Sequence, residues 1–263
     1  MKAGPFSIMW RMIKRIAYFL VGRGKNGDKK MEAKKTSIVI VGMKNSAKFG
    51  KCLGADVDAT TMTNMLSAYG KPVVLRDAQA KKAAVVAALS EAIKADLCIF
   101  CYSGHGGSEK FADTKFDASE PDGKDEYLCL YDTYLKDTEI WSIISKAKGR
   151  VFMVFDCCHS ATMFRSATGT EEDVKSEPFT MQMLDGIVLP QGATTNLLVW
   201  SGCPDDNYSY GDASGGVLTN AIKKSFDKDR TYDEVWEKAK KLAADQHPQR
   251  TQLGEGFGGK VFR

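Results

Sequence analysis

The stretch DLCIFCYSGHGG, residues 96–107, decides the fold of this chain. Residues 96–102 are mostly apolar and show no alternation, which is typical of a strand buried on both faces of a sheet. The apolar run ends at a polar, glycine-rich segment around His105. A second stretch of this kind, RVFMVFDCCHS at residues 150–160, ends at Asp156. Both stretches place polar side chains directly after a buried strand.

Outside these two stretches, strand patterns alternate with helix patterns. Further strands are expected at 36–41, 72–75, 127–131 and 196–200, and helices at 56–69, 81–95, 137–147, 217–226 and 232–246. This alternation predicts an α/β fold, a three-layer α/β/α sandwich with a mainly parallel central sheet. In such sheets ligands bind beyond the carboxyl ends of the strands. The segments after residues 102 and 155 are therefore the expected site.

The charge is distributed unevenly. The 263 residues carry 37 Lys+Arg against 33 Asp+Glu, a net charge of +4. Residues 1–35 hold ten basic and two acidic residues, so this N-terminal extension carries +8 and the remainder −4. Because the basic charge is confined to the extension, we expect no nucleic-acid partner. Residues 6–21 are apolar but interrupted by basic residues, which suits weak contact with a membrane or a partner. A leader without function is the alternative.

The cysteines indicate a reducing compartment. There are seven, without a regular even framework, and Cys98, Cys101 and Cys129 lie inside apolar runs. This arrangement favours buried thiols over disulfides, and over a redox or zinc pair at Cys98 and Cys101. No apolar stretch reaches the ~18 residues that span a bilayer, and no secretory cleavage site is evident. We expect a cytoplasmic protein, with peripheral membrane association through residues 6–21 as a further option.

Histidines narrow the search for catalytic residues, because the chain has only three. A nucleophilic cysteine needs an imidazole that accepts its proton. His247 lies in a polar segment beside a proline, and His159 directly follows Cys158 on a loop, where neighbouring side chains point apart. His105 is therefore the favoured base, and its flanking glycines are interpreted as room for a substrate backbone. A glycine turn with an incidental histidine is the alternative.

Four motifs together carry a family resemblance. They are LGADVDA at 53–59, YSGHGG at 102–107, DCCHS at 156–160 and SGCPDD at 201–206. With His105 placed 53 residues before Cys158, the chain resembles the metacaspase and orthocaspase branch of the caspase-like cysteine peptidases, family C14 of clan CD. Caspases proper carry Gln-Ala-Cys-(Arg/Gln/Gly)-Gly at the nucleophile, so DCCHS favours the metacaspase branch.

The resemblance implies a caspase-like domain and assigns its catalytic groups. His105 is the general base, and Cys158 is the nucleophile because it directly precedes His-Ser. The reaction is peptide-bond hydrolysis through a thioester acyl-enzyme. The backbone N–H groups of Gly106 and Cys158 form the oxyanion hole. No cofactor is required for this chemistry.

The resemblance also implies cleavage after Arg or Lys in protein or peptide substrates. A cationic side chain that enters a pocket needs a carboxylate to offset its desolvation. The family's two pocket aspartates fall on Asp58 and Asp156, with Ser103 as a polar wall. The alternative for Asp58 is a charge favoured by the macrodipole at the start of its own helix. One departure is Ala55, where the family has a cysteine.

Calcium is a candidate activator by the same resemblance. Residues 109–139 hold ten acidic residues against four lysines, and hard cations prefer such oxygen ligands. The family's Asp-Asp-Glu stretch reads Asp-Thr-Glu at 137–139, so one expected ligand is missing. A solvated acidic loop is the alternative. The candidate ligands are Asp122, Asp125, Asp137 and Glu139.

The expected organisation is an N-terminal extension, residues 1–35, followed by a peptidase domain, residues 36–263. Within that domain we expect a large-subunit-like part (36–164), a linker (165–190) and a small-subunit-like part (191–263). Arg165 and Lys175 in the linker are candidate autoprocessing sites. By resemblance to metacaspases we expect a monomer. The rival to a peptidase is a catalytically silent scaffold or binding module, and a phosphatase loop is disfavoured because six residues, not five, separate Cys158 from Arg165.

Overall fold

A six-stranded sheet forms the centre of the fold. The computed structural model describes residues 35–110, 124–157, 196–202 and 211–262, and residues 34–263 make up one compact unit. The strand order is β13-β10-β9-β5-β1-β4. Its strands are β1 (Thr36–Gly42), β4 (Val73–Arg76), β5 (Leu97–Gly104), β9 (Arg150–Cys157), β10 (Asn196–Ser201) and β13 (Gln249–Leu253). All neighbours pair in parallel except β10 with β13, which confirms the mainly parallel sheet.

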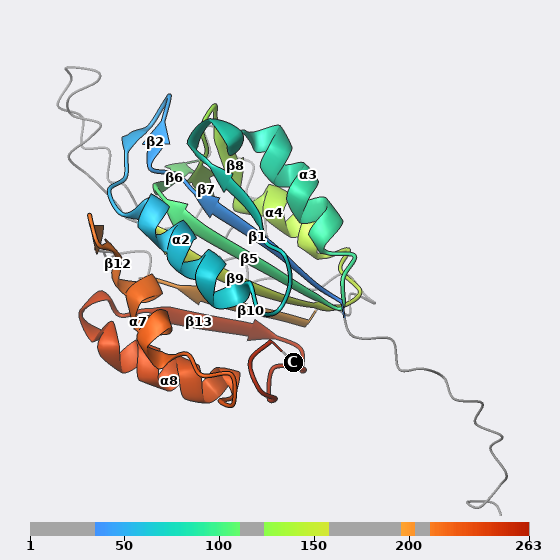
Figure 1. Ribbon diagram of the computed structural model, residues 1–263. Coiled ribbons are helices and arrows are strands. Elements are labelled where there is room, and N and C mark those ends of the chain that lie inside the picture. Colours follow the sequence, from blue (N-terminus) through green and yellow to red (C-terminus); the bar gives the residue numbers. More distant parts are fainter. Residues whose placement is uncertain (1–34, 111–123, 158–195, 203–210, 263) are drawn as a thin grey trace, which may run out of the picture. The chain divides into compact units, whose positions relative to one another are not determined.

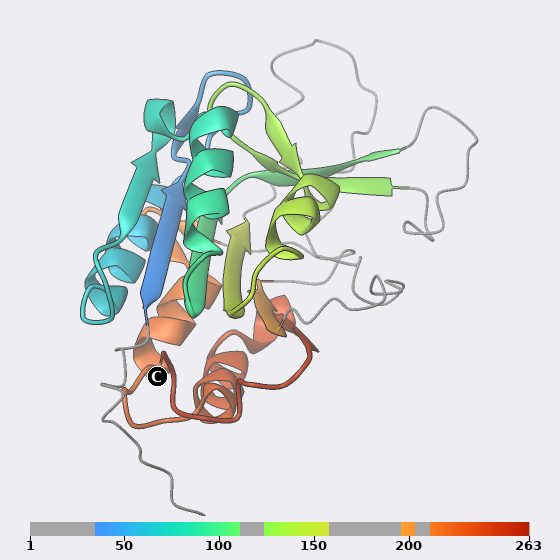
Figure 2. The same cartoon turned by 90° about the vertical axis from the view of Figure 1, so that its right-hand side faces the viewer.

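Helices cover both faces of this sheet (Figures 1 and 2). They are α2 (Ala55–Leu66), α3 (Lys82–Ala92), α4 (Asp137–Ile144), α7 (Val217–Ser225) and α8 (Tyr232–Leu242). Helices α3 and α4 pack on one face, and α2, α7 and α8 pack on the other. The predicted three-layer α/β/α sandwich is therefore confirmed.

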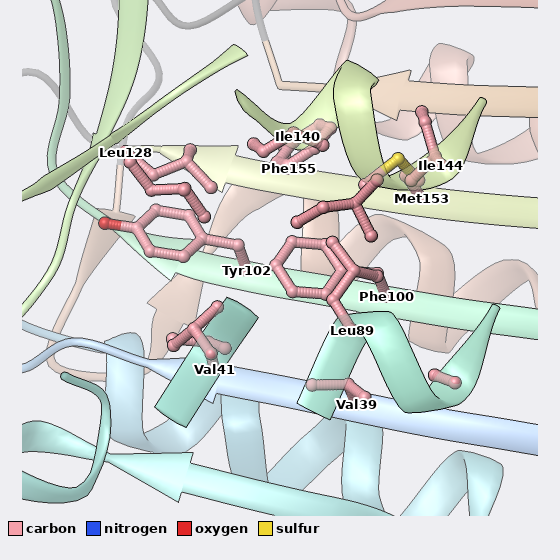
Figure 3. Packing of buried hydrophobic residues seen from close by; sticks show 14 of the residues in the cluster. Val39, Val41, Leu89, Phe100, Tyr102, Leu128, Ile140, Ile144, Met153 and Phe155 are labelled. Atoms are coloured by element: carbon pink, nitrogen blue, oxygen red, sulfur yellow. The ribbon is translucent and has the colours of Figure 1, made fainter. Parts of the chain in front are cut away.

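The apolar run of β5 is explained by burial on both faces. Cys98, Phe100 and Tyr102 belong to the core beneath α3 and α4, whereas Ile99 and Cys101 belong to the core beneath α2, α7 and α8. Figure 3 shows Phe100 and Tyr102 packed among side chains from α3, α4 and the neighbouring strands. Successive side chains of a strand point to opposite faces, and both faces of β5 are covered, so every residue of β5 is buried and residues 97–102 are apolar. The side chains of β5 thus contribute to the hydrophobic cores on both faces of the sheet.

Smaller elements surround the carboxyl ends of the main strands. They are the hairpin β2 (Asn45–Ser46) with β3 (Gly50–Lys51), the sheet of β6 (Gly106–Lys110), β7 (Lys124–Cys129) and β8 (Tyr134–Lys136), the hairpin β11 (Gly211–Asp212) with β12 (Gly215–Gly216), and the 3-10 turns η1 (Asp77–Gln79) and η2 (Ala244–Gln246). Figure 2 shows the β6–β7–β8 sheet projecting beside α4. The sequence predicted strand 127–131 in this region, but the structure pairs 124–129 with β6 because Glu109–Lys110 extend antiparallel to Lys124–Asp125.

Some sequence predictions lie outside the described residues. These are the N-terminal extension, including residues 6–21, and the linker 165–190. None of the helices in the described part of the chain is long and apolar enough to cross a membrane.

Candidate active site

The register of the sheet brings the two chemical motifs together at one edge. On β5 and β9, Ser103 pairs with Asp156, and Gly104 pairs with Cys157. His105 is the next residue after Gly104, and Cys158 is the next residue after Cys157. Cys158 itself lies outside the described residues. The two motifs therefore leave adjacent strands at the same level, at the carboxyl ends where α/β sheets bind ligands.

Three of the predicted pocket residues form one buried cluster. Asp58, in the first turn of α2, accepts a 2.6 Å hydrogen bond at Oδ2 from Ser103 Oγ at the end of β5. Asp156 lies beside Ser103 on β9. The exposed fractions of Asp58, Ser103 and Asp156 are 2%, 4% and 1%. The structure thus brings together residues that are 45 and 53 positions apart in the sequence.

The amino-terminal end of α7 binds both carboxylates of this cluster. Gly216 N donates to Asp58 Oδ1 at 2.9 Å, and Thr219 N donates to Asp156 Oδ2 at 2.7 Å. Free backbone N–H groups and the helix dipole make such an end favourable for anions. Figure 1 shows β12 and the start of α7 near α2. Asp58 lies in the first turn of its own helix but makes these hydrogen bonds to β5 and to the start of α7.

Burial gives Asp58 an unusual protonation behaviour. Desolvation and then the neighbouring Asp156 raise the pKa of Asp58 to about 7, although hydrogen bonds from Ser103 and Gly216 lower it. Two carboxylates held this closely disfavour ionisation of both. The groups that act most strongly on Asp58 are thus a hydroxyl, a backbone N–H and other carboxylates, without a cation.

His105 is held in one tautomer by a backbone carbonyl that sequence reasoning missed. His105 Nε2 lies 2.9 Å from Lys51 O at the end of β3. A carbonyl oxygen can only accept, so Nε2 carries the proton and, in the neutral ring, Nδ1 is the basic nitrogen. His105 is only 8% exposed. A histidine with one nitrogen fixed in this way is suited to accept a proton at the other.

The main chain of His105 is fixed as firmly as its ring. Its carbonyl oxygen accepts a 2.6 Å hydrogen bond from Tyr102 Oη and a 2.9 Å hydrogen bond from Cys129 N. A Cβ at Gly104 would lie 2.5 Å from the Tyr102 hydroxyl. At Gly104 the missing side chain thus admits Tyr102, and not a substrate backbone as the sequence had suggested. Gly106, the expected oxyanion donor, is buried at the start of β6.

Of the four calcium candidates, the structure describes the side chains of Asp137 and Glu139. Glu139 Oε2 pairs with Lys82 Nζ at 2.7 Å, and Asp137 is fully buried and accepts a hydrogen bond from Thr138 N. Asp122 and the side chain of Asp125 lie outside the described residues. No three His, Cys, Asp or Glu side chains among the described residues are placed to hold a metal ion together. Asp137 and Glu139 therefore already interact with other groups of the protein.

The structure also describes the predicted buried cysteines and His247. Cys98, Cys101 and Cys129 are buried free thiols, as expected, and burial raises the pKa of each to about 12. His247 is exposed near the start of β13, as expected.

Comparisons with known proteins agree with this arrangement. The family model described as "Caspase domain" (Peptidase_C14) matches residues 36–255. A crystal structure of a protein from Geobacter sulfurreducens superposes with a TM-score of 0.66 at 23% identity, covering 87% of this chain and 98% of the other. Caspase-1 from Spodoptera frugiperda superposes with a TM-score of 0.56 at 14% identity, covering 87% and 91%. No curated protein sequence matches detectably. The chain belongs to the caspase-domain family, a family of cysteine peptidases.

Proposed function

We propose that this protein is a cysteine endopeptidase of the metacaspase type that cleaves peptide bonds after Arg or Lys. Cys158 is the nucleophile, His105 is the general base, and the cluster of Asp58, Ser103 and Asp156 binds the cationic side chain. The DCCHS motif at 156–160 supports the metacaspase branch.

One observation carries the specificity. Two carboxylates are buried around Ser103, two positions before the proposed catalytic histidine, and the strongest influences on Asp58 include no cation. Burying such charge is costly unless a partner of opposite sign compensates it. A guanidinium or ammonium group of the substrate is such a partner. Gly216 and the start of α7 contact the pair directly.

The proposed mechanism assigns each proton a place. His105 Nδ1 takes the proton from Cys158 Sγ, and the thiolate attacks the backbone carbonyl carbon of the Arg or Lys residue. Backbone N–H groups of Gly106 and Cys158 stabilise the oxyanion. His105 then protonates the leaving amine and a thioester forms. Water, deprotonated by His105, hydrolyses the thioester and regenerates the thiol.

A panel of fluorogenic peptides tests this proposal. Peptides that differ only in Arg, Lys, Asp or Ala before the scissile bond are compared, with added calcium and with excess chelator, because calcium is a candidate activator. Hydrolysis of the Arg and Lys peptides is expected, and it is lost in Cys158→Ala and His105→Ala. A preference for Asp would overturn the proposed specificity.

The scaffold alternative has a separate readout. An arginine-based chloromethylketone or epoxide labels a reactive cysteine irreversibly, and mass spectrometry locates the label. Labelling of Cys158 supports the peptidase, whereas no labelling under any ionic condition favours a silent scaffold.

Autoprocessing is tested on the same samples, because cleavage at Arg165 or Lys175 by the protein itself stops in Cys158→Ala.

A further inference from the structure

We propose that Asp77 is a positioning residue for His105 and acts through the β2–β3 hairpin. This inference rests on the proposed function, because it concerns the orientation of the proposed general base. Asp77 does not touch the imidazole. It binds one edge of a hairpin whose other edge holds the imidazole in place.

The backbone of Asp77 is in a conformation that side chains rarely adopt. Its φ is 43°, one of three positive φ values at non-glycine residues in the described part of the chain. Such strain persists where the surroundings over-determine it, and it concentrates at functional sites. Asp77 begins the 3-10 turn η1 directly after β4, at the carboxyl edge of the main sheet. The strain is therefore found close to the proposed site.

Both carboxylate oxygens of Asp77 accept hydrogen bonds from Asn45. Oδ1 accepts a 2.7 Å hydrogen bond from Asn45 N, and Oδ2 accepts a 2.9 Å hydrogen bond from Asn45 Nδ2. Hydrogen bonds to an ionised acceptor are stronger than those between neutral groups. This two-point contact fixes both the position and the orientation of Asn45.

The register of the hairpin connects the contact at Asn45 with the contact at His105. Asn45 and Lys51 are directly opposite each other on β2 and β3. Cys52 N donates to Lys44 O in the adjacent pair, so in an antiparallel ladder the backbone groups of Asn45 and Lys51 face outward. On one side Asn45 N meets Asp77, and on the other Lys51 O meets His105 Nε2. The hairpin thus lies between Asp77, which it contacts through Asn45, and His105, which it contacts through Lys51.

Other anchors lie at the base of the hairpin, where Lys44 Nζ pairs with Asp56 Oδ2 at 3.0 Å, and at its turn. Ser46 Oγ donates to Leu130 O at 3.0 Å and accepts from Phe49 N, and Ala47 N donates to Tyr131 O at 3.2 Å. These contacts hold the turn against the segment after β7. Asp77 holds Asn45, opposite the residue that touches His105. Removing the carboxylate therefore frees the Lys51 carbonyl more than the hairpin as a whole.

Replacement of Asp77 by glycine tests the role cleanly. Glycine adopts φ 43° without strain, although it adds backbone freedom, so Asp77→Gly permits the same path of the chain and removes the side chain with its carboxylate. Asn45→Ala removes one of the two hydrogen bonds and serves as a second variant should the first not fold. The matched control is Asp227→Gly, because Asp227 also accepts a hydrogen bond from a backbone N–H, that of Asp229 at 3.0 Å, on an exposed loop.

Two readouts separate positioning from mere stability. For an Arg peptide, kcat of Asp77→Gly falls roughly 10-fold while KM stays unchanged, because a small misplacement of the base slows chemistry without touching the binding cluster. Nitrogen-15 NMR of the histidine rings shows His105 as the Nε2–H tautomer in the unsubstituted protein, and as a tautomer mixture in Asp77→Gly. Asp227→Gly changes neither quantity.

The outcomes are distinguishable from a failure of the proposed function. If the unsubstituted protein hydrolyses no Arg or Lys peptide, the proposed function falls, and the His105 tautomer still decides whether Asp77 positions the ring. If Asp77→Gly, or Asn45→Ala in its place, leaves both kcat and the His105 signals unchanged, the positioning role is overturned.

Discussion

Ser103 Oγ lies 2.6 Å from Asp58 Oδ2, and Ser103 is also the register partner of Asp156 on the adjacent strand. Ser103 therefore neighbours two buried carboxylates, one from α2 and one from β9. One hydroxyl hydrogen satisfies only one of them, and the remaining acceptors turn to the amino-terminal end of α7. The three residues together form an anionic cluster at the end of the sheet.

Replacing Asp58 by asparagine tests whether this cluster binds a cation. Asn keeps the size and the acceptor oxygen for Ser103 but removes the charge. Loss of one partner from a buried ion pair costs about 3–5 kcal/mol, so kcat/KM for an Arg peptide falls roughly 100-fold or more in Asp58→Asn. Steady-state kinetics with Arg and Ala peptides measure the effect, and the Ala peptide is affected far less.

Asp56→Asn is the matched control for that substitution. Asp56 lies in the same first turn of α2, but its carboxylate pairs with Lys44 Nζ at 3.0 Å, and this pair holds the pKa of Asp56 below its usual range. We expect Asp56→Asn to leave the preference for Arg intact. Equal losses in the two variants would mean that the helix turn, and not the buried cluster, is responsible.

The raised pKa of Asp58 makes cation binding depend on pH. Asp58 titrates at about 7 without a cation, under the influence of Asp156, Asp56, Ser103 and Gly216. A bound guanidinium favours the ionised carboxylate, so binding releases a proton and tightens as the pH rises. The affinity of Cys158→Ala protein for an Arg peptide is expected to increase roughly 10-fold from pH 6 to pH 8. Titration calorimetry measures it.

The same titration has the opposite sign for stability. Asp58 keeps its proton in the folded protein up to about pH 7, whereas its ordinary pKa is 3.8. Its contribution to the free energy of unfolding is therefore fully present below about pH 4 and is lost as the pH rises to about 7. Asp58→Asn removes both dependences. A pH profile of affinity that is identical in Asp58→Asn would assign the titration to another group.

The sequence predicted best those strands that are buried on both faces of the sheet. The runs at 96–102 and 150–155 became β5 and β9 because a strand covered on both faces contains an uninterrupted apolar pattern. In contrast, β13 is a polar strand at the sheet edge, and the hairpins β2–β3 and β11–β12 have strands of only two residues. Such short or polar strands are defined by their partners, so their own residues show no periodic signal.

The site shows a similar division. The family resemblance named Asp58, Ser103 and Asp156, and the structure places them in one cluster. The resemblance did not identify Lys51, because Lys51 contacts His105 through its backbone carbonyl, a group that every residue possesses. Gly216 likewise acts through its N–H group, 158 positions after Asp58 in the chain. Contacts of this kind depend on how distant segments pack, and side-chain identity does not encode them.

Gly216 offers a steric test of how α7 meets the cluster. An added Cβ would lie 2.2 Å from Asp156 Oδ2, and the φ of Gly216 is −72°, which any residue adopts. Gly216→Ala is therefore strained by contact alone, and we expect the free energy of unfolding to fall by about 1–3 kcal/mol. Denaturant unfolding measures the change. Gly258→Ala is the control, since a Cβ there meets nothing within 4 Å. Equal stability of both variants would contradict the tight packing of α7 on Asp156.

Tyr102→Phe tests whether the backbone of His105 must be held. The hydroxyl lies 2.6 Å from His105 O and 2.8 Å from Cys129 O, and its loss leaves buried acceptors weakly satisfied, at a cost of about 1–3 kcal/mol. Tyr232→Phe is the comparator, because its hydroxyl accepts from Phe262 N in the core beneath α7 and α8, away from His105. Both variants lose stability in thermal unfolding, but only Tyr102→Phe also loses kcat, by roughly 3-fold to 10-fold. A kcat unchanged in Tyr102→Phe would show that Cys129 N alone keeps His105 in place.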